Sequence, residues 1–216
     1  MINHCFVFAR GGSKGLPGKN LLKINGVSLV GHAINTAKKL DNNQKVFLST
    51  DSDEIANVGK KCGALIIERP SNLADDTAAE WDAWSHAVKH VEDKYGPFDK
   101  FISLPPTSPC RRIEDVRKCI EKLDDKTDIV ITTTVSHRNP WFNMVIQDTA
   151  NYVKLVNSES TITRRQDCPK CLDIATVAYA AHPQFIKQNK GIWDGNVKSV
   201  EVPKYSSIDI DTLYDF

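Results

Sequence analysis

The sequence predicts an α/β fold with three layers, in which helices cover both faces of a mainly parallel sheet. Apolar and β-branched segments of strand length alternate with amphipathic segments of helix length over the first 135 residues. This alternation is typical of a parallel sheet with helices on both faces. The first apolar segment, residues 4–9, also leads directly into a glycine-rich turn at 10–20. Ligands of open α/β sheets bind at the edge where strands end in this way.

The individual elements follow from local patterns. Strands are expected at residues 4–9, 45–49, 64–67, 98–104 and 128–135. Helices are expected at about 29–40, 52–62, 77–94 and 113–123. Ser28 precedes the first helix and can cap it. Asp51 is expected to cap the second helix, and Asp75 and Asp76 precede the third as caps that complement its dipole.

The alternation stops after residue 135. Residues 141–147 and 151–156 have the character of strands around a polar turn, and no helical pattern returns until about residue 183. We therefore expect a single domain, residues 1–216, in which residues 136–170 form a β-rich excursion from the main sheet.

Composition narrows the classes of protein. The net charge is +1 and no basic stripe dominates, which argues against a nucleic-acid-binding surface. No apolar run reaches the roughly 18 residues of a membrane span, and the start of the chain lacks the layout of a signal peptide. The cytoplasm is the expected compartment. Cys168 and Cys171 are a lone C-x-x-C pair, and we expect unpaired thiols there.

The turn from Arg10 to Asn20 concentrates groups that bind phosphate. It contains four glycines, one proline and the three cations Arg10, Lys14 and Lys19. Glycines allow close approach of the backbone to a ligand, and successive N–H groups in a turn can bind an anion. The pattern is not a Walker A loop, because Ser13 stands where that loop has its first glycine and Asn20 replaces its hydroxyl residue.

This turn resembles the signature loop of the CMP-sugar synthetases, cytidylyltransferases that activate sialic acid and related 3-deoxy-2-keto acids with CTP. Further blocks occur in the order of that family: Ser49-Thr-Asp-Ser52, Glu68-Arg-Pro70, Pro106-Thr-Ser-Pro109, Arg164-Arg-Gln-Asp167 and Ser207-Ile-Asp-Ile-Asp211. The resemblance covers essentially the whole chain. It implies a Rossmann-like nucleotidyltransferase fold, transfer of CMP from CTP to a sugar acid, and a homodimer in which the excursion crosses the interface.

The resemblance also implies a set of CTP-binding residues: Arg10, Gly12, Ser13, Lys14, Lys19, Asn20 and Arg69. Lys19 is the best candidate for stabilising charge on the α-phosphoryl group in the transition state. Arg10 and Asp211 are the other residues expected to take part in catalysis.

Asp209 and Asp211 are the predicted ligands of Mg²⁺. At i, i+2 on an extended segment, both carboxylates project from one face. Magnesium is typically held by one or two carboxylates together with phosphate oxygens and waters. The pair matches the metal motif of the resembled family, whose cation would polarise the α-phosphate. The alternative is a solvated acidic tail.

The residues that would bind the sugar acceptor are less well defined by the sequence than those for CTP. The resemblance implies that Arg165 binds the carboxylate of the sugar, with Gln166 and Tyr179 beside it, although Tyr179 also fits a core position. Pro105 stands where sialic acid enzymes have glutamine, and Ala175 stands in a block where they commonly have Asn-Gly. Glu80 stands at a position where the resembled family, near the base, often has a small hydroxyl residue.

Three acceptor or activity classes therefore stay open. A nine-carbon acid of the sialic, legionaminic or pseudaminic type is the leading expectation for the acceptor. An eight-carbon acid of the Kdo type is the second. The third is a catalytically silent nucleotide-binding module that keeps the fold and the loop.

Overall fold

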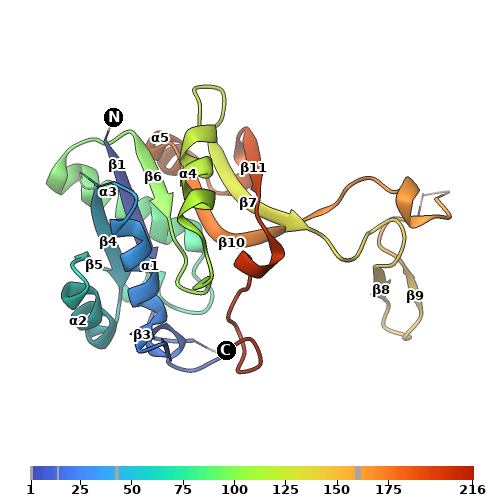
Figure 1. The fold of residues 1–216 in the computed structure, drawn as a ribbon, viewed down its shortest axis with the longest axis horizontal. Helices are drawn as coiled ribbons and strands as arrows, with labels where there is room; N and C mark the ends of the chain where they lie inside the picture. Colours follow the sequence, from blue (N-terminus) through green and yellow to red (C-terminus); the bar gives the residue numbers. More distant parts are fainter. Residues whose placement is uncertain (1, 14, 42–43, 159–161) are drawn as a thin grey trace.

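A seven-stranded sheet forms the centre of the molecule (Figure 1). The computed structural model describes residues 2–13, 15–41, 44–158 and 162–216. The strands lie in the order β11-β7-β10-β6-β1-β4-β5. Their bounds are β1 Asn3–Phe8, β4 Lys45–Thr50, β5 Leu65–Glu68, β6 Lys100–Ser103, β7 Ile129–Val135, β10 Leu172–Ala181 and β11 Val197–Glu201. Only β10 runs antiparallel to its neighbours, β6 and β7. The mainly parallel sheet is therefore confirmed.

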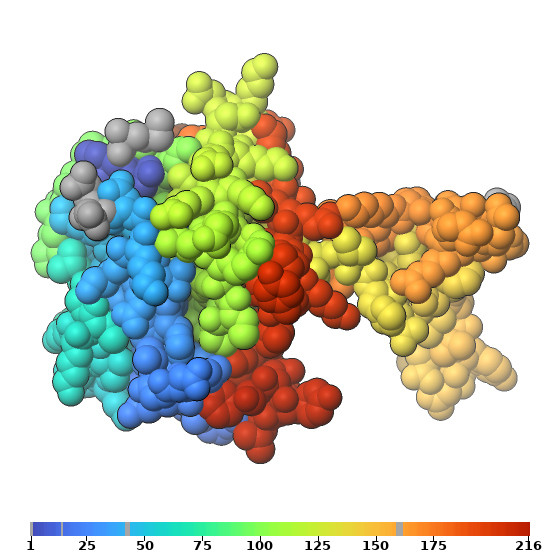
Figure 2. All heavy atoms as spheres, in the orientation of Figure 1, coloured from blue at the N-terminus to red at the C-terminus, as the bar shows by residue number. Residues whose placement is uncertain are grey.

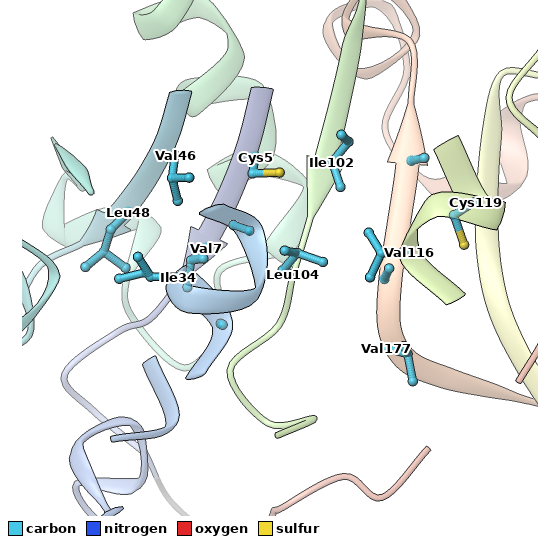
Figure 3. Packing of buried hydrophobic residues seen from close by; sticks show 14 of the residues in the cluster. Cys5, Val7, Ile34, Val46, Leu48, Ile102, Leu104, Val116, Cys119 and Val177 are labelled. Atoms are coloured by element: carbon cyan, nitrogen blue, oxygen red, sulfur yellow. The ribbon is translucent and has the colours of Figure 1, made fainter. Parts of the chain in front are cut away.

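Helices cover both faces of this sheet. Their bounds are α1 Leu29–Lys38, α2 Asp53–Lys61, α3 Glu80–Tyr95, α4 Ile113–Lys122 and α5 Pro183–Gln188. One core cluster joins the sheet to α1, α2 and α4, and a second joins it to α3 and α5. In Figure 3, Ile34 of α1 lies against Val7 and Leu48 of adjacent strands. The predicted three-layer arrangement is confirmed.

Two short strands, β2 (Lys23–Ile24) and β3 (Val27–Ser28), form a hairpin just before α1. Ser28 caps α1 as expected, because its Oγ accepts a hydrogen bond from the backbone N–H of Gly31 at 3.1 Å. None of the helices in the described parts of the chain is both long and apolar enough to cross a membrane.

The expected cap of α2 was wrong. Ser52, not Asp51, is the N-cap, and its Oγ accepts from the N–H of Ile55 at 3.4 Å. Asp51 instead accepts from the backbone N–H of Gly11 at 2.9 Å. Its carboxylate is therefore committed to the glycine-rich turn after β1, which no local pattern could reveal.

The start of α3 also differs from the prediction. The helix begins at Glu80 and has no side-chain cap, whereas we expected it to begin near Thr77. Oδ1 of Asp75 accepts from the backbone N–H groups of Thr77 and Ala78 at 2.8 and 2.7 Å. This Asx turn offers the backbone an alternative to the helix. Asp75 and Asp76 are therefore loop residues and do not cap α3.

An arm, residues 136–171, leaves the sheet between β7 and β10, and its described residues stand away from the globular part (Figures 1 and 2). It carries a hairpin of β8 (Val145–Gln147) and β9 (Val153–Leu155). These strands are shorter than predicted, because residues 142–144 turn back to donate to the carbonyl of Asn139. The predicted excursion is thus a projecting arm.

Candidate active site

A cleft of about 370 Å³ opens at the edge of the sheet where β1, β5 and β6 end. The strand order reverses at β1, which lies between β4 and β6. Such a reversal is where ligands bind in open α/β sheets. Seven of the predicted site residues line the cleft: Arg10, Gly12, Ser13, Lys19, Asn20, Arg69 and Tyr179. Lys14, also predicted, lies outside the described residues.

The glycine-rich turn is held in place by two hydrogen bonds. One is the bond from Gly11 N–H to Asp51, and the other runs from Nδ2 of Asn20 to the carbonyl of Arg10 at 3.0 Å. Gly18, at φ 67°, occupies the left-handed region and starts the short 3₁₀ helix Lys19–Leu21. This shape places the Lys19 and Arg10 side chains at the cleft.

Both predicted catalytic cations are paired with carboxylates of the same chain. Nζ of Lys19 lies 2.7 Å from Oδ1 of Asp211, and Nη1 of Arg10 lies 2.9 Å from Oδ1 of Asp76. Arg10 also donates to the carbonyl of Asp75 at 2.9 Å. The glycine-rich turn is therefore tied to two other segments, the C-terminal segment and the loop before α3.

The C-terminal segment reaches the cleft by docking onto the loop after β6. The backbone N–H of Ile210 donates to the carbonyl of Thr107 at 2.8 Å, and the Ile210 side chain is buried. Asp209 and Asp211 flank this anchor. A Cβ on Gly15 would lie only 2.6 Å from the carbonyl oxygen of Asp211, so the segment also packs tightly against the glycine-rich turn.

The two carboxylates fit a magnesium ion by their chemistry. Oδ1 of Asp209 is buried without a hydrogen-bond partner among the described residues, which is a site that a cation would satisfy. Within the same residues there is no cluster of three His, Cys, Asp or Glu side chains able to hold a metal. Two carboxylates completed by phosphate oxygens are the usual protein environment of Mg²⁺ at a nucleotide.

Arg69 is fixed against the end of β4. Its Nε donates to Oγ of Ser49 at 3.1 Å, and its Nη2 donates to the Ser49 carbonyl at 2.9 Å. The guanidinium also lies 5.7 Å from the centre of the Phe8 ring. Burial lowers the pKa of Arg69, and the nearby charge of Asp51 opposes this shift. A guanidinium remains charged under such conditions, so Arg69 keeps one wall of the cleft positive.

Glu80 and Tyr179 form the opposite wall. Glu80 opens onto the cleft, and its Oε1 accepts from Nε1 of Trp84 at 3.2 Å. Surrounding protein atoms raise the pKa of Glu80, and the charge of Asp209 adds to this effect. Tyr179 packs on Trp84 with ring centres 5.3 Å apart, and burial raises the pKa of its phenol. Tyr179 is therefore both a core residue and a lining residue.

The predicted sugar-binding residues of the arm are not brought to this cleft within one chain. Arg165 and Gln166 lie on the 3₁₀ helix Arg165–Asp167, and Nη2 of Arg165 donates to the carbonyl of His137 in the same arm. Pro105 lines the cleft, whereas Ala175 is buried in β10 behind it. Thr176 lines the cleft instead, hydrogen-bonded through its hydroxyl to Ser108 at 2.9 Å.

Sequence reasoning missed the contributions of Asp76, Thr107 and Thr176. Asp76 pairs with Arg10, Thr107 anchors the C-terminal segment through its carbonyl, and Thr176 faces the cleft. The Pro106-Thr-Ser-Pro109 block was a signal for Thr107. Nothing in the local pattern distinguishes the other two from solvated loop and strand residues.

Comparisons with known proteins agree with this geometry. The protein-family model for cytidylyltransferases matches residues 4–191. The post-translational flagellin modification protein B of Campylobacter coli is 34% identical over 98% of this chain and 91% of that protein. The CMP-N,N'-diacetyllegionaminic acid synthase of Campylobacter jejuni is 32% identical, again over 98% of this chain and 91% of that protein.

The fold is shared with a solved nucleotide complex. CMP:2-keto-3-deoxy-manno-octonic acid synthetase, solved with CTP, superposes with a TM-score of 0.72. The match covers 99% of this chain and 95% of that chain, at 18% sequence identity. The α/β nucleotidyltransferase fold expected from the sequence is therefore confirmed.

Proposed function

The chain belongs to the cytidylyltransferase family, and from this premise we propose that it transfers CMP from CTP to the anomeric hydroxyl of a 2-keto-3-deoxy sugar acid. The hydroxyl oxygen forms a bond to the α-phosphorus as the bond to the β-phosphate oxygen breaks. Pyrophosphate leaves with the electron pair, and the hydroxyl proton passes to solvent. The observation that carries the proposal is the 2.7 Å contact between Lys19 and Asp211. It joins the glycine-rich turn to the segment that carries Asp209 and Asp211.

The donor half is supported by the charges around the cleft. Arg10 and Lys19 line the cleft, so their charges can offset that of a triphosphate, and Lys19 is the proposed group that stabilises charge on the α-phosphoryl group. Asp209 and Asp211 would hold Mg²⁺, which supplies electrophilic polarisation of the α-phosphate. Held in this way, the triphosphate presents its α-phosphorus to an acceptor in the same cleft, and positioning supplies much of the rate.

The acceptor is proposed to be a nine-carbon acid of the legionaminic, sialic or pseudaminic type. The Campylobacter jejuni relative is named for diacetyllegionaminic acid, and it aligns with 98% of this chain. Pro105 in the cleft offers no N–H and no amide group to an acceptor. We therefore expect the choice among these acids to rest on other polar groups of the cleft, including Thr176.

A homodimer is proposed because two of the three predicted sugar-binding residues lie away from the cleft within one chain. Arg165 and Gln166 lie on the projecting arm, and Tyr179 lies at the cleft. The arm also exposes apolar side chains, including Val145 at 56% and Val153 at 60%. In the proposed assembly each arm covers the cleft of the partner. Since the donor is CTP, the cytoplasm is the proposed location.

The decisive experiment is release of pyrophosphate with CTP and Mg²⁺ against a panel of sugar acids. The panel contains legionaminic, pseudaminic, N-acetylneuraminic and eight-carbon keto-deoxy acids. We expect turnover with at least one nine-carbon acid, and only weak turnover when ATP, GTP or UTP replaces CTP. Turnover confined to the eight-carbon acid would overturn the acceptor class. Binding of CTP without turnover on any acid would indicate a silent nucleotide-binding module.

A further inference from the structure

Arg111 lies beneath the cleft, at the junction between the loop after β6 and α4. Its side chain is buried, with the residue only 8% exposed. Nε donates to the carbonyl of Ser108 at 3.0 Å, and Nη2 donates to the carbonyl of Pro105. These two carbonyls flank Pro106 and Thr107, which line the cleft. The guanidinium therefore fixes the shape of the loop from behind.

The third nitrogen of this guanidinium has no partner. Nη1 of Arg111 is buried and unbonded among the described residues, and so is Oδ1 of Asp209. Burial lowers the pKa of Arg111, and the charge of Asp209 is among those that oppose this shift. No hydrogen bond joins the two side chains directly. A buried cation and a buried carboxylate oxygen each cost free energy unless another charge or a hydrogen bond compensates them.

The backbone joins the same two segments. Thr107, inside the loop that Arg111 fixes, accepts the hydrogen bond from Ile210 N–H at 2.8 Å. Ile210 stands between the two predicted metal ligands. Displacement of the loop would therefore displace both carboxylates, whereas displacement of α4 alone would not.

Resting on the proposed function, we propose that Arg111 is the positioning residue for the metal-binding carboxylate of Asp209. It acts by fixing the loop whose Thr107 carbonyl anchors Ile210, and with Ile210 the segment that carries the Asp209 carboxylate. Groups that orient a metal ligand change metal affinity by about 10–100-fold when they are removed. Arg111 thus tunes the cation site without touching the nucleotide.

The neighbouring Arg112 shows what a purely structural arginine looks like here. Its Nε and Nη2 bind both oxygens of the buried Asp115 at 3.0 and 2.7 Å, and its Nη1 donates to the Tyr205 hydroxyl at 3.2 Å. These bonds secure the 3₁₀ helix Lys204–Ser206, ahead of the carboxylates. Arg112 is therefore a control for stability, and the exposed Arg117 on α4 is a control for charge.

The test measures Mn²⁺ binding to the enzyme–CTP complex by electron paramagnetic resonance, with no sugar acid present. We expect Arg111→Gln to weaken Mn²⁺ binding about tenfold, and Arg111→Lys, which keeps the charge but loses the fork, to weaken it less. Arg112→Lys should lower the melting temperature with less than a twofold change in Mn²⁺ affinity. Arg117→Gln should change neither quantity.

A double-mutant cycle with Asp209→Asn separates positioning from folding. If Arg111 positions Asp209, Arg111→Lys should have a smaller effect on Mn²⁺ affinity in the Asp209→Asn background than in the wild type, because only the Asp211 carboxylate is then left for the loop to position. Unchanged Mn²⁺ affinity in Arg111→Lys and Arg111→Gln, or equal effects of Arg111→Lys in both backgrounds, would overturn the inference. If the wild-type protein binds no Mn²⁺ with CTP, the proposed function fails first and this inference fails with it.

Discussion

The cations of the cleft already have carboxylate partners before any nucleotide binds. Lys19 pairs with Asp211, and Arg10 pairs with Asp76. The carboxylate of each pair is exposed to solvent, and ion pairs screened in this way contribute only about 0–1 kcal/mol to stability. Charge-assisted hydrogen bonds to a phosphate are stronger, particularly the paired bonds of an arginine. A triphosphate can therefore exchange these partners at small cost, which leaves both cations available to it.

In the proposed mechanism Lys19 is the charged donor that stabilises the α-phosphoryl group, so Lys19→Gln should lower turnover by about 10²–10³-fold. The melting temperature should change by less than about 2 °C, since the pair with the exposed Asp211 contributes little to stability. Pyrophosphate release and thermal unfolding measure the two effects. Lys23→Gln, on the exposed end of β2, is the matched control and should retain full activity. Full activity in Lys19→Gln would remove this lysine from the mechanism.

Glu80→Gln should stabilise the protein at neutral pH. The surroundings raise the pKa of Glu80, so the folded protein binds more protons than the unfolded chain between the two pKa values. Stability from this group is present below the unfolded pKa and is lost as pH rises through the folded pKa. Glu80 is exposed, so solvent reduces this effect, and the variant should melt only slightly above the wild type at pH 7.5 and close to it at pH 4.

Differential scanning calorimetry at the two pH values checks this prediction. Glu121→Gln, on the exposed side of α4, is the control, and its melting temperature should differ from that of the wild type by the same small amount at both pH values. A gain for Glu80→Gln that is larger at pH 4 than at pH 7.5 would contradict the assigned direction of the pKa shift.

The elements that the sequence predicted well are those whose signals are local. The first β-strands and α1, α2 and α4 follow apolar periodicity, and Ser28 caps α1 by a bond three residues away. The errors occur where a distant partner decides. Asp51 accepts a hydrogen bond from the distant Gly11 and so does not cap α2. Strand β11 was missed because only Val197 and Val200 mark it as a strand, and its pairing with β7 is not visible in the local sequence.

Gly15→Ala tests the contact between the glycine-rich turn and the C-terminal segment. The added Cβ would lie 2.6 Å from the carbonyl oxygen of Asp211, so one of the two backbones must move. We expect a loss of turnover of about tenfold or more, because small displacements of catalytic groups are costly, while the circular dichroism spectrum stays unchanged. Gly191→Ala, where a Cβ meets no atom within 4 Å, is the control and should stay active. Equal activities would show that this contact is not needed.

Across the whole molecule, the site is assembled from segments that only the fold brings together. Lys19 and Asp211 are 192 residues apart in the sequence. Composition and spacing identified each of them as a candidate, but their contact depends on how the chain crosses the sheet and returns along the loop after β6. The arm differs, because the fold does not bring its predicted site residue to the cleft. The excursion itself was predicted from the sequence, but Arg165 lies away from the cleft of its own chain.

Subunit mixing gives a sharp test of the proposed dimer. Suppose that each active site combines the cleft of one subunit with the arm of its partner. A heterodimer of Lys19→Gln and Arg165→Ala subunits then contains one site with both defects and one site with none. Random pairing makes about half of the dimers mixed, so about a quarter of the wild-type sites should be restored.

The experiment co-expresses the two variants with different affinity tags and measures pyrophosphate release from the mixture and from each variant alone. The control is the pair Lys19→Gln and Arg10→Ala, which places both defects in the cleft. If the arm served its own chain, every site in the mixture would carry one defect and activity would stay at the level of the single variants. Charged substitutions at Val145 and Val153 should abolish the restoration, because these exposed apolar side chains lie on the arm that must pack against the partner. Light scattering should then report a monomer, and an unchanged dimer would place the interface elsewhere.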